Sequence, residues 1–158
     1  MAGAGAVFLV DPIPARQQAA ADLGAAGTAP DCSLVQTWTS GRGVDVVLEA
    51  TDAEDAAAGA AEAARIGGKV VLAGIPGTDR VVLRAATLRR KGLTLKMVRR
   101  MKHTYPRAIR MACDGRVQLD PLITHRFPLA EAAAAFACHA DRADGVIRAV
   151  VEIPGCRS

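Results

Sequence analysis

The α/β character of this chain is clearest at Val44-Asp45-Val46-Val47-Leu48-Glu49-Ala50, a nearly continuous apolar run after the turn Gly41-Arg42-Gly43. Such a run is typical of a strand in a parallel sheet whose two faces are covered by helices. The alanine-rich stretch Ala53 to Ile66 predicts a helix that ends at Gly67-Gly68, and Lys69 to Gly74 predicts the next strand. A strand, a helix and a strand at this spacing indicate a right-handed crossover unit.

The flanking sequence repeats this alternation in both directions. Val7 to Val10 predicts a short strand that ends at Asp11, and Pro14 to Leu23 predicts a helix. Further elements are expected after the central unit, as strands at Val81 to Leu83, Leu93 to Val98, Leu122 to Phe127 and Val146 to Ile153, and as helices at Tyr105 to Asp114 and Pro128 to Ala140. We therefore expect an α/β fold with a Rossmann-like, mostly parallel sheet and flanking helices.

One part of that fold is missing from the pattern. In a dinucleotide-binding fold, a carboxylate such as Asp11 ends the second strand, about 20 residues after a glycine-rich phosphate loop. Gly3-Ala4-Gly5 does not fit that loop, because a strand follows it instead of a helix. We expect the first strand and its phosphate-loop unit to be lacking. In the strand order 3-2-1-4-5-6 this strand would lie between the Val7 and Val44 strands, so its loss leaves two unpaired edges.

Asp11 and Arg16 form the first candidate site. A carboxylate at a strand end can accept hydrogen bonds from both ribose hydroxyls of NAD, and it repels the additional phosphate of NADP. Arg16 follows about one helical turn later and can reach the adenosine or its ribose. The alternative is a structural role, because an aspartate beside a proline also commonly starts a helix.

Composition and charge limit the other functions. The 158 residues have the length of one domain, carry a net charge of +4 and include only 3% aromatic residues. Eleven Lys or Arg and no acidic residue lie between Arg80 and Arg110, which indicates either an anionic partner or a solvated basic face. The anion could be a cofactor phosphate, whereas nucleic acid is disfavoured because stacking aromatic residues are scarce.

Cellular location and cysteine chemistry are also constrained. No apolar run approaches the roughly 20 residues that span a bilayer, and no secretory signal is evident, so we expect a cytoplasmic protein. The four cysteines are Cys32, Cys113, Cys138 and Cys156. They form no closely spaced pair, and we expect free, mostly buried thiols in preference to metal ligands.

Five collinear segments carry a resemblance to a known family. The chain resembles the zinc-type medium-chain alcohol and polyol dehydrogenases, especially the sorbitol and threonine dehydrogenase branch, in the order and spacing of that family's carboxyl-terminal half. The matching segments are Asp11 to Arg16, Gly41 to Thr51, Gly67 to Gly74, Lys96 to Ile109 and Pro121 to Leu129.

The resemblance implies a function and a domain organisation. The chain would be the carboxyl-terminal portion of an NAD-dependent dehydrogenase that transfers hydride from a secondary alcohol to NAD, and it would be inactive alone. Residues 1–120 would be a partial dinucleotide-binding domain, and residues 121–158 would return to the catalytic domain. A non-enzymatic nucleotide-binding or dimerisation module is the alternative.

The resemblance also implies eight NAD-binding positions. Asp11 matches the ribose-binding acid that favours NAD, Arg16 matches the arginine that accompanies it, and Thr51 matches a residue on the adenine side. The remaining positions are Ala73, Gly74 and Ile75, whose backbone faces the nicotinamide amide, and Arg99 and Arg100, which match the segment at the nicotinamide end and the pyrophosphate. The family usually has glycine in place of Asp52, and a carboxylate there would crowd or repel the cofactor.

No catalytic or metal-binding residue is assigned. His125 lies on a strand that is structural in the family, and the family's zinc ligands belong to its amino-terminal half, which these segments do not match. The resemblance also implies the partners, which are NAD, an upstream fragment that supplies the missing half, and a second copy paired through the sheet edge near Leu93 to Val98.

Overall fold

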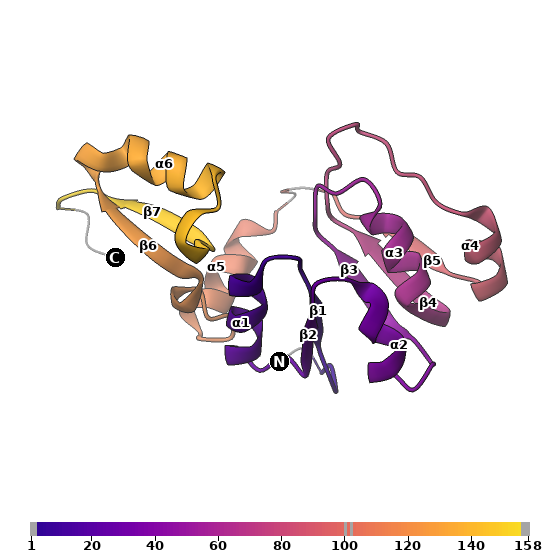
Figure 1. Ribbon diagram of the computed structural model, residues 1–158. Coiled ribbons are helices and arrows are strands. Elements are labelled where there is room, and N and C mark those ends of the chain that lie inside the picture. Colours follow the sequence, from indigo (N-terminus) through magenta and orange to yellow (C-terminus); the bar gives the residue numbers. More distant parts are fainter. Residues whose placement is uncertain (1–2, 100, 102, 156–158) are drawn as a thin grey trace. The chain divides into compact units, whose positions relative to one another are not determined.

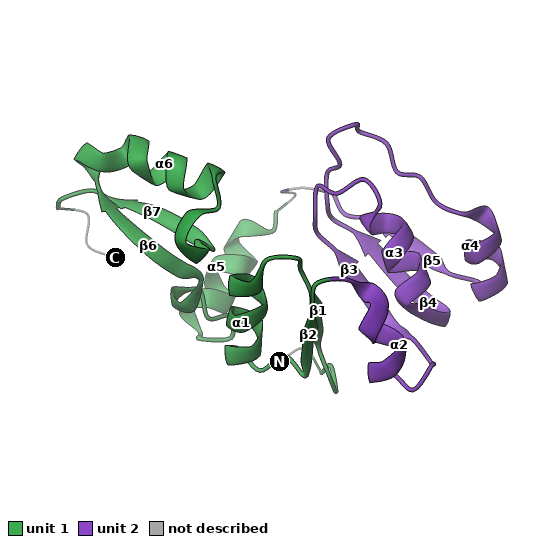
Figure 2. Cartoon of the chain, viewed as in Figure 1, with its two compact units in different colours: residues 1–30, 103–158 green, residues 31–102 purple. Residues whose placement is uncertain are grey.

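The computed structural model describes residues 3–99, 101 and 103–155. The chain divides into two compact units, which are residues 1–30 together with 103–158, and residues 31–102 (Figure 2). Each unit contains parallel strands with helices packed against them, which confirms the predicted α/β class.

The central unit is built on a three-stranded parallel sheet with the order β3-β4-β5 (Figure 1). Its elements, in chain order, are α2 (Val35–Trp38), β3 (Val44–Glu49), α3 (Ala56–Ala63), β4 (Ala64–Leu72), α4 (Ala85–Lys91) and β5 (Thr94–Met97). The predicted strand, helix and strand are therefore confirmed. The predicted strand at Val81 to Leu83 is wrong, because these residues form irregular chain in the described structure.

The predicted end of the central helix is also wrong. The helix stops at Ala63, and β4 begins at Ala64 and continues through Gly67 and Gly68. Val44 pairs with Ala64 but Val46 pairs with Lys69, so one residue of β3 lies opposite four residues of β4. Gly67, at φ 69°, takes the left-handed conformation that this bulge requires.

An ion cluster spans the bulge. The Asp45 carboxylate accepts two hydrogen bonds from the Arg42 guanidinium, at 2.6 and 3.0 Å, and one from Arg65 Nε at 2.6 Å. The two guanidiniums, Arg42 first and Arg65 second, hold the pKa of Asp45 well below its usual range. Because all three side chains are exposed, the cluster fixes the local geometry more than it adds to stability.

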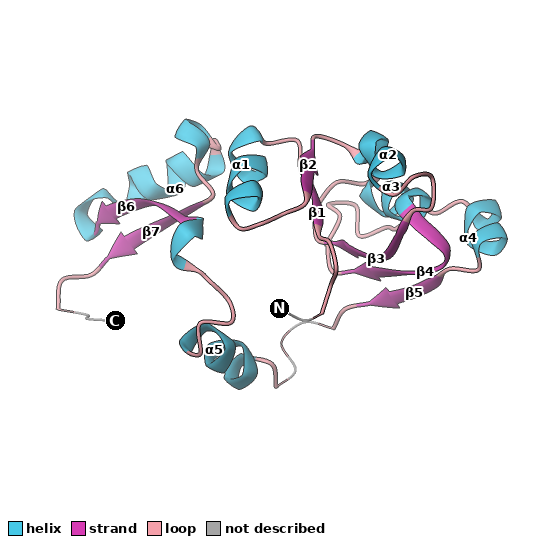
Figure 3. Cartoon of the chain, turned by 90° about the horizontal axis from the view of Figure 1, so that it is seen from below, coloured by secondary structure: helices cyan, strands magenta, loops and turns pink. Residues whose placement is uncertain are grey.

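The core of the central unit is small and rich in alanine. Val70 is fully buried, and it clusters with Leu72, Ala57, Ala60 and Ala64. Figure 3 shows α3 over one side of the sheet, and its alanine face allows the helix to approach the strands closely. The alternating β3 residues Val46 and Leu48 are 50% and 74% exposed.

The other unit contains two separate parallel strand pairs. β1 (Phe8–Val10) pairs with β2 (Gly27–Ala29), and α1 (Pro14–Asp22) connects them. The second pair and its neighbours are α5 (Tyr105–Cys113), β6 (Ile123–Pro128), α6 (Ala132–Ala140) and β7 (Arg148–Glu152). The predicted strands and helices of these regions are confirmed, with ends that differ by a few residues.

The described strands form three separate sheets, with the orders β1-β2, β3-β4-β5 and β6-β7. Each strand pair within these sheets is parallel.

The thiols differ from the expectation. Cys32, Cys113 and Cys138 are free, but Cys113 is exposed and the other two are only partly buried, so the prediction of mostly buried thiols is wrong for these three. Burial, followed by the charges of Asp31 and Asp55, raises the pKa of the Cys32 thiol. Cys156 lies outside the described residues.

Lys91 closes the carboxyl end of α3. Its Nζ donates hydrogen bonds to the carbonyl oxygens of Ala61, Glu62 and Ala64, at 3.2, 2.6 and 3.0 Å. Carbonyls at a helix end lack partners within the helix, and a cation there also interacts favourably with the helix dipole. Lys91 thereby ties α4 to the junction between α3 and β4.

We expect Lys91→Met to lower the free energy of unfolding by about 1–2 kcal/mol, because three carbonyls lose a charged donor. Chemical denaturation followed by circular dichroism measures this change. Arg90→Met is the matched control, since Arg90 is an exposed neighbour on the same helix. Equal losses of unfolding free energy in the two variants would contradict the role of Lys91 at the end of α3.

Candidate functional site

Asp11 and Arg16 contact each other at the end of β1. Arg16 Nη1 donates to Asp11 Oδ2 at 3.3 Å, and the Ile13 amide donates to Asp11 Oδ1 at 2.9 Å. The Asp11 side chain is 19% exposed and the Arg16 side chain 37%. Gln17 Nε2 donates to the Asp11 carbonyl at 2.7 Å, which further fixes the turn.

The Asp11 carboxylate keeps capacity for a ligand. A carboxylate has about four acceptor positions, and the hydrogen bonds from Ile13 and Arg16 occupy two of them. The two remaining acceptor positions match two hydroxyl donors, such as those of a ribose. The contacts of Asp11 with the turn before α1 therefore leave its carboxylate able to accept further hydrogen bonds.

A second group of predicted site residues meets at the carboxyl ends of β3 and β4. The amides of Ala73 and Gly74 donate to the Glu49 carbonyl, at 2.8 and 3.2 Å. Gly74 is also packed so closely that a Cβ on it would overlap the Thr51 carbonyl oxygen. Thr51 and Gly74, which are 23 positions apart in the sequence, are thus neighbours.

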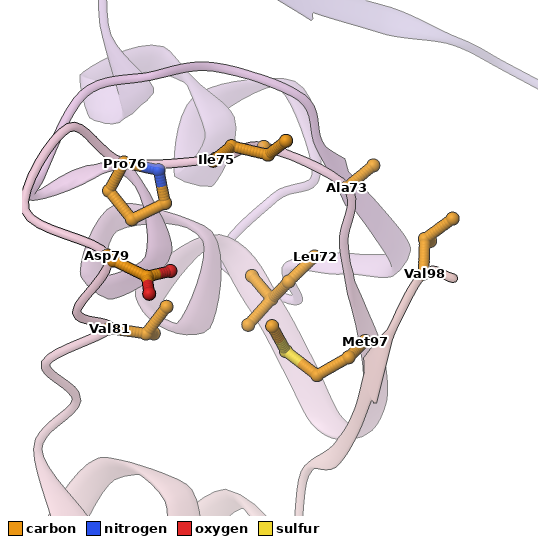
Figure 4. Close-up of a pocket in the computed structure, with 9 residues that line it drawn as sticks. Leu72, Ala73, Ile75, Pro76, Asp79, Val81, Met97 and Val98 are labelled. Atoms are coloured by element: carbon orange, nitrogen blue, oxygen red, sulfur yellow. The ribbon is translucent and has the colours of Figure 1, made fainter. Parts of the chain in front are cut away.

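A cavity of about 290 Å³ opens beside this junction (Figure 4). It is lined by Leu72 to Pro76, by Asp79 and Val81, and by Met97 and Val98. Most of the lining is apolar, and Asp79 supplies a carboxylate. A cavity at the carboxyl ends of parallel strands is the usual place for a ligand in an open α/β sheet.

The predicted residues therefore form two groups. Ala73, Gly74 and Ile75 line the cavity, and Thr51 lies against Gly74. Asp11 and Arg16 form the pair in the other unit. Arg99 directly follows the cavity residue Val98 and is exposed, whereas Arg100 lies outside the described residues.

Two further residues near this junction, Glu49 and Asp79, were not predicted from the sequence. Glu49 contacts the turn at Thr51, and Asp79 lies in the loop after β4, where its carboxylate borders the cavity. Glu49 was visible as the acidic end of an apolar strand, which is a position that commonly faces a site in this architecture. Asp79 carried no comparable signal, because its proximity to Met97 depends on the strand pairing.

His125 has a structural environment. Its Nδ1 lies 3.0 Å from the hydroxyl oxygen of Thr124, and its ring stacks on Phe127 with a centroid distance of 6.4 Å. In the part of the chain that the structure describes, no group of three or more His, Cys, Asp and Glu could hold a metal ion. These residues therefore do not fit a zinc site. Over the same residues, no helix is long and apolar enough to cross a membrane.

The fold and the two groups define a class of protein. Parallel strands with crossover helices, an acidic residue at the end of β1 and a cavity at the ends of β4 and β5 are features of the doubly wound nucleotide-binding proteins. Residues 1–113 match the family described as zinc-binding dehydrogenase. The chain belongs to this family.

Curated relatives agree with this assignment. The L-arabinitol 4-dehydrogenase of Aureobasidium melanogenum is 34% identical over 114 residues, which are 71% of this chain and 31% of that protein. The L-threonine 3-dehydrogenase of Symbiobacterium thermophilum is 36% identical over 143 residues, which are 85% of this chain and 41% of that protein. The chain thus spans well under half the length of these relatives, and its match lies in their carboxyl-terminal half.

Solved structures show the same partial correspondence. An alcohol dehydrogenase from Thermus sp. ATN1 superposes with a TM-score of 0.84 at 26% identity, over 96% of this chain and 45% of that one. A 2R,3R-butanediol dehydrogenase from Bacillus subtilis, at 23% identity, shares the fold with a TM-score of 0.81. The names of these relatives and solved structures are those of dehydrogenases.

We expect Gly74→Ala to lower the free energy of unfolding by about 1–3 kcal/mol, because its methyl group would overlap the Thr51 carbonyl. The midpoint of urea denaturation measures the effect. Gly77→Ala is the matched control, since a Cβ at Gly77 meets no atom within 4 Å. A Gly74→Ala variant as stable as the control would show that β3 and β4 are not this close.

Proposed function

We propose that this chain supplies the NAD-binding portion of a zinc-type alcohol or polyol dehydrogenase. The observation that carries the proposal is the Asp11 carboxylate, which ends β1, contacts Arg16 and keeps acceptor positions for two hydroxyl groups. The assignment to the family and the dehydrogenase relatives support it.

The proposed roles follow from the geometry of each group. Asp11 would accept the hydroxyls of the adenosine ribose, and Arg16 would orient that carboxylate. Ala73, Gly74 and Ile75 would contact the nicotinamide end, with Thr51 on the adenine side and Arg99 and Arg100 toward the pyrophosphate. In this proposal residues 1–120 belong to the dinucleotide-binding domain, and residues 121–158 form the segment that returns to the catalytic domain.

The proposed reaction is the oxidation of a secondary alcohol to a ketone. NAD, when bound, would supply the acceptor for the hydride, and the hydroxyl proton would be released to solvent. The described residues would contribute binding and orientation, because the cavity is walled mostly by apolar residues, with the Asp79 carboxylate among them. They do not fit a zinc site, so no step of the alcohol activation is assigned to them. Asp52 remains a departure from the family pattern, and a carboxylate there would weaken the affinity for a phosphate-bearing cofactor.

We expect the chain to bind NADH at least about 10-fold more tightly than NADPH, because Asp11 repels a 2′-phosphate. Asp11→Asn should weaken NADH binding by about 10-fold and reduce the preference, since the charged acceptor is lost. Fluorescence titration measures both dissociation constants. Asp22→Asn, at the far end of α1, is the control, and an unchanged preference in Asp11→Asn would contradict the proposal.

We also propose that two copies pair through β5. Among the described residues β5 pairs only with β4, and all four of its residues are exposed. Leu95, Met97 and Val98 are 39%, 64% and 48% exposed. A free strand edge with apolar side chains is suited to pairing with an identical edge related by a two-fold axis.

A charge within this edge should prevent the pairing. We expect Leu95→Asp to shift the chain from dimer to monomer in sedimentation velocity, because the pairing would bury an uncompensated carboxylate. Val82→Asp introduces the same charge at a site that is 71% exposed and outside β5. Dissociation by both variants, or by neither, would refute the β5 interface.

A further inference from the structure

Glu49, the last residue of β3, connects two segments of the proposed cofactor pocket. Its Oε1 accepts a hydrogen bond from the Thr51 amide at 2.6 Å. Its backbone carbonyl accepts hydrogen bonds from the amides of Ala73 and Gly74, at 2.8 and 3.2 Å. One residue therefore binds the turn after β3 with its side chain and the end of β4 with its main chain.

The Glu49 carboxylate also fills the space beside Gly74. The position that a Cβ of Gly74 would take lies 2.6 and 2.7 Å from the two carboxylate oxygens. A carboxylate thus occupies the place of a side chain at residue 74. It sets the separation between the Thr51 turn and the strand end, and the absence of a side chain at Gly74 is what permits this.

The orientation of the pocket wall depends on this contact. Ala73 and Gly74, whose amides donate to the Glu49 carbonyl, line the cavity together with Ile75, the next residue. A hydrogen bond from an amide to a carboxylate is stronger than one between neutral groups. Residues that bind a ligand keep their geometry only when neighbouring groups hold them in place.

We propose that Glu49 is a positioning residue of the cofactor pocket, one that acts through Thr51 and Gly74. This inference rests on the proposed NAD-binding function and adds a residue to it. Glu49 holds the turn and the strand end at the separation that the nicotinamide end of NAD requires. It makes no contact with the cofactor in this role.

The test combines one measurement that needs no cofactor with one that does. Hydrogen exchange, resolved by NMR, reports the protection of the Thr51 amide, and fluorescence titration reports the dissociation constant for NADH. In Glu49→Ala we expect the Thr51 amide to exchange about 10-fold faster and NADH to bind about 10-fold more weakly. Glu49→Gln keeps an acceptor oxygen on a side chain of the same length. Its Thr51 exchange rate and its dissociation constant for NADH should both remain within about 3-fold of those of the parent chain.

Two further variants separate positioning from a general effect of charge or folding. Glu49→Asp keeps the charge but is shorter by one methylene, so it should behave like Glu49→Ala and serves in its place if that variant does not fold. Glu54→Ala removes an exposed carboxylate from the segment between β3 and α3 and should change neither measurement. Both comparisons are made at a temperature where unfolding curves show each variant to be native.

The outcomes distinguish this inference from the function on which it rests. If Glu49→Ala and Glu49→Asp bind NADH as the parent chain does, the positioning role is overturned. The positioning role is also overturned if Glu49→Gln loses as much affinity for NADH as Glu49→Ala does. The same conclusion follows if the parent chain binds NADH although its Thr51 amide is not protected from exchange. A parent chain that binds no NADH while Thr51 stays protected refutes the NAD-binding function, and the positioning role with it.

Discussion

The close approach of the carboxyl ends of β3 and β4 is the constraint on which the central unit depends. Gly74 lies against both the Thr51 carbonyl and the Glu49 carboxylate, and any side chain at residue 74 would separate the two strands. The bulge opposite Asp45 sets the register at the other end of the same strand pair. With both ends fixed, β4 brings Ala73 to Ile75 to the cavity edge that β5 completes with Met97.

Most strands and helices of this fold could be predicted from local sequence. Apolar runs that stop at glycine, proline or an acidic residue predicted β1, β3 and β4, because such residues are common where strands end. The end of α3 was not predictable in this way. Alanine continues through the junction, and the bulge brings Arg65 to Asp45, which is 20 positions earlier in the chain. Register is a tertiary property, and a helix can be shortened to satisfy it.

In the candidate site, too, some contacts follow from local sequence and others depend on how the strands pair. The Asp11 and Arg16 contact could be predicted from a spacing of about one helical turn, since both residues belong to the same local segment. The strand end at Gly74 was recognisable from a family pattern, but its dependence on Glu49 was not. That dependence combines the register of β3 against β4 with the lack of a Cβ at Gly74, and neither can be read from a single segment.

The proposed function assigns the described residues to the binding of a cofactor. Asp11 offers a charged acceptor for hydroxyl groups, and the cavity at Gly74 offers apolar walls with backbone polar groups at the strand ends. Such features bind and orient a nucleotide, whereas activation of an alcohol needs a group that withdraws charge from its oxygen. The residues described here form no ligand set for a metal that could do so. Under the proposed NAD-binding function, substitutions among these residues should act first on cofactor affinity, and a binding measurement tests that role more directly than turnover does.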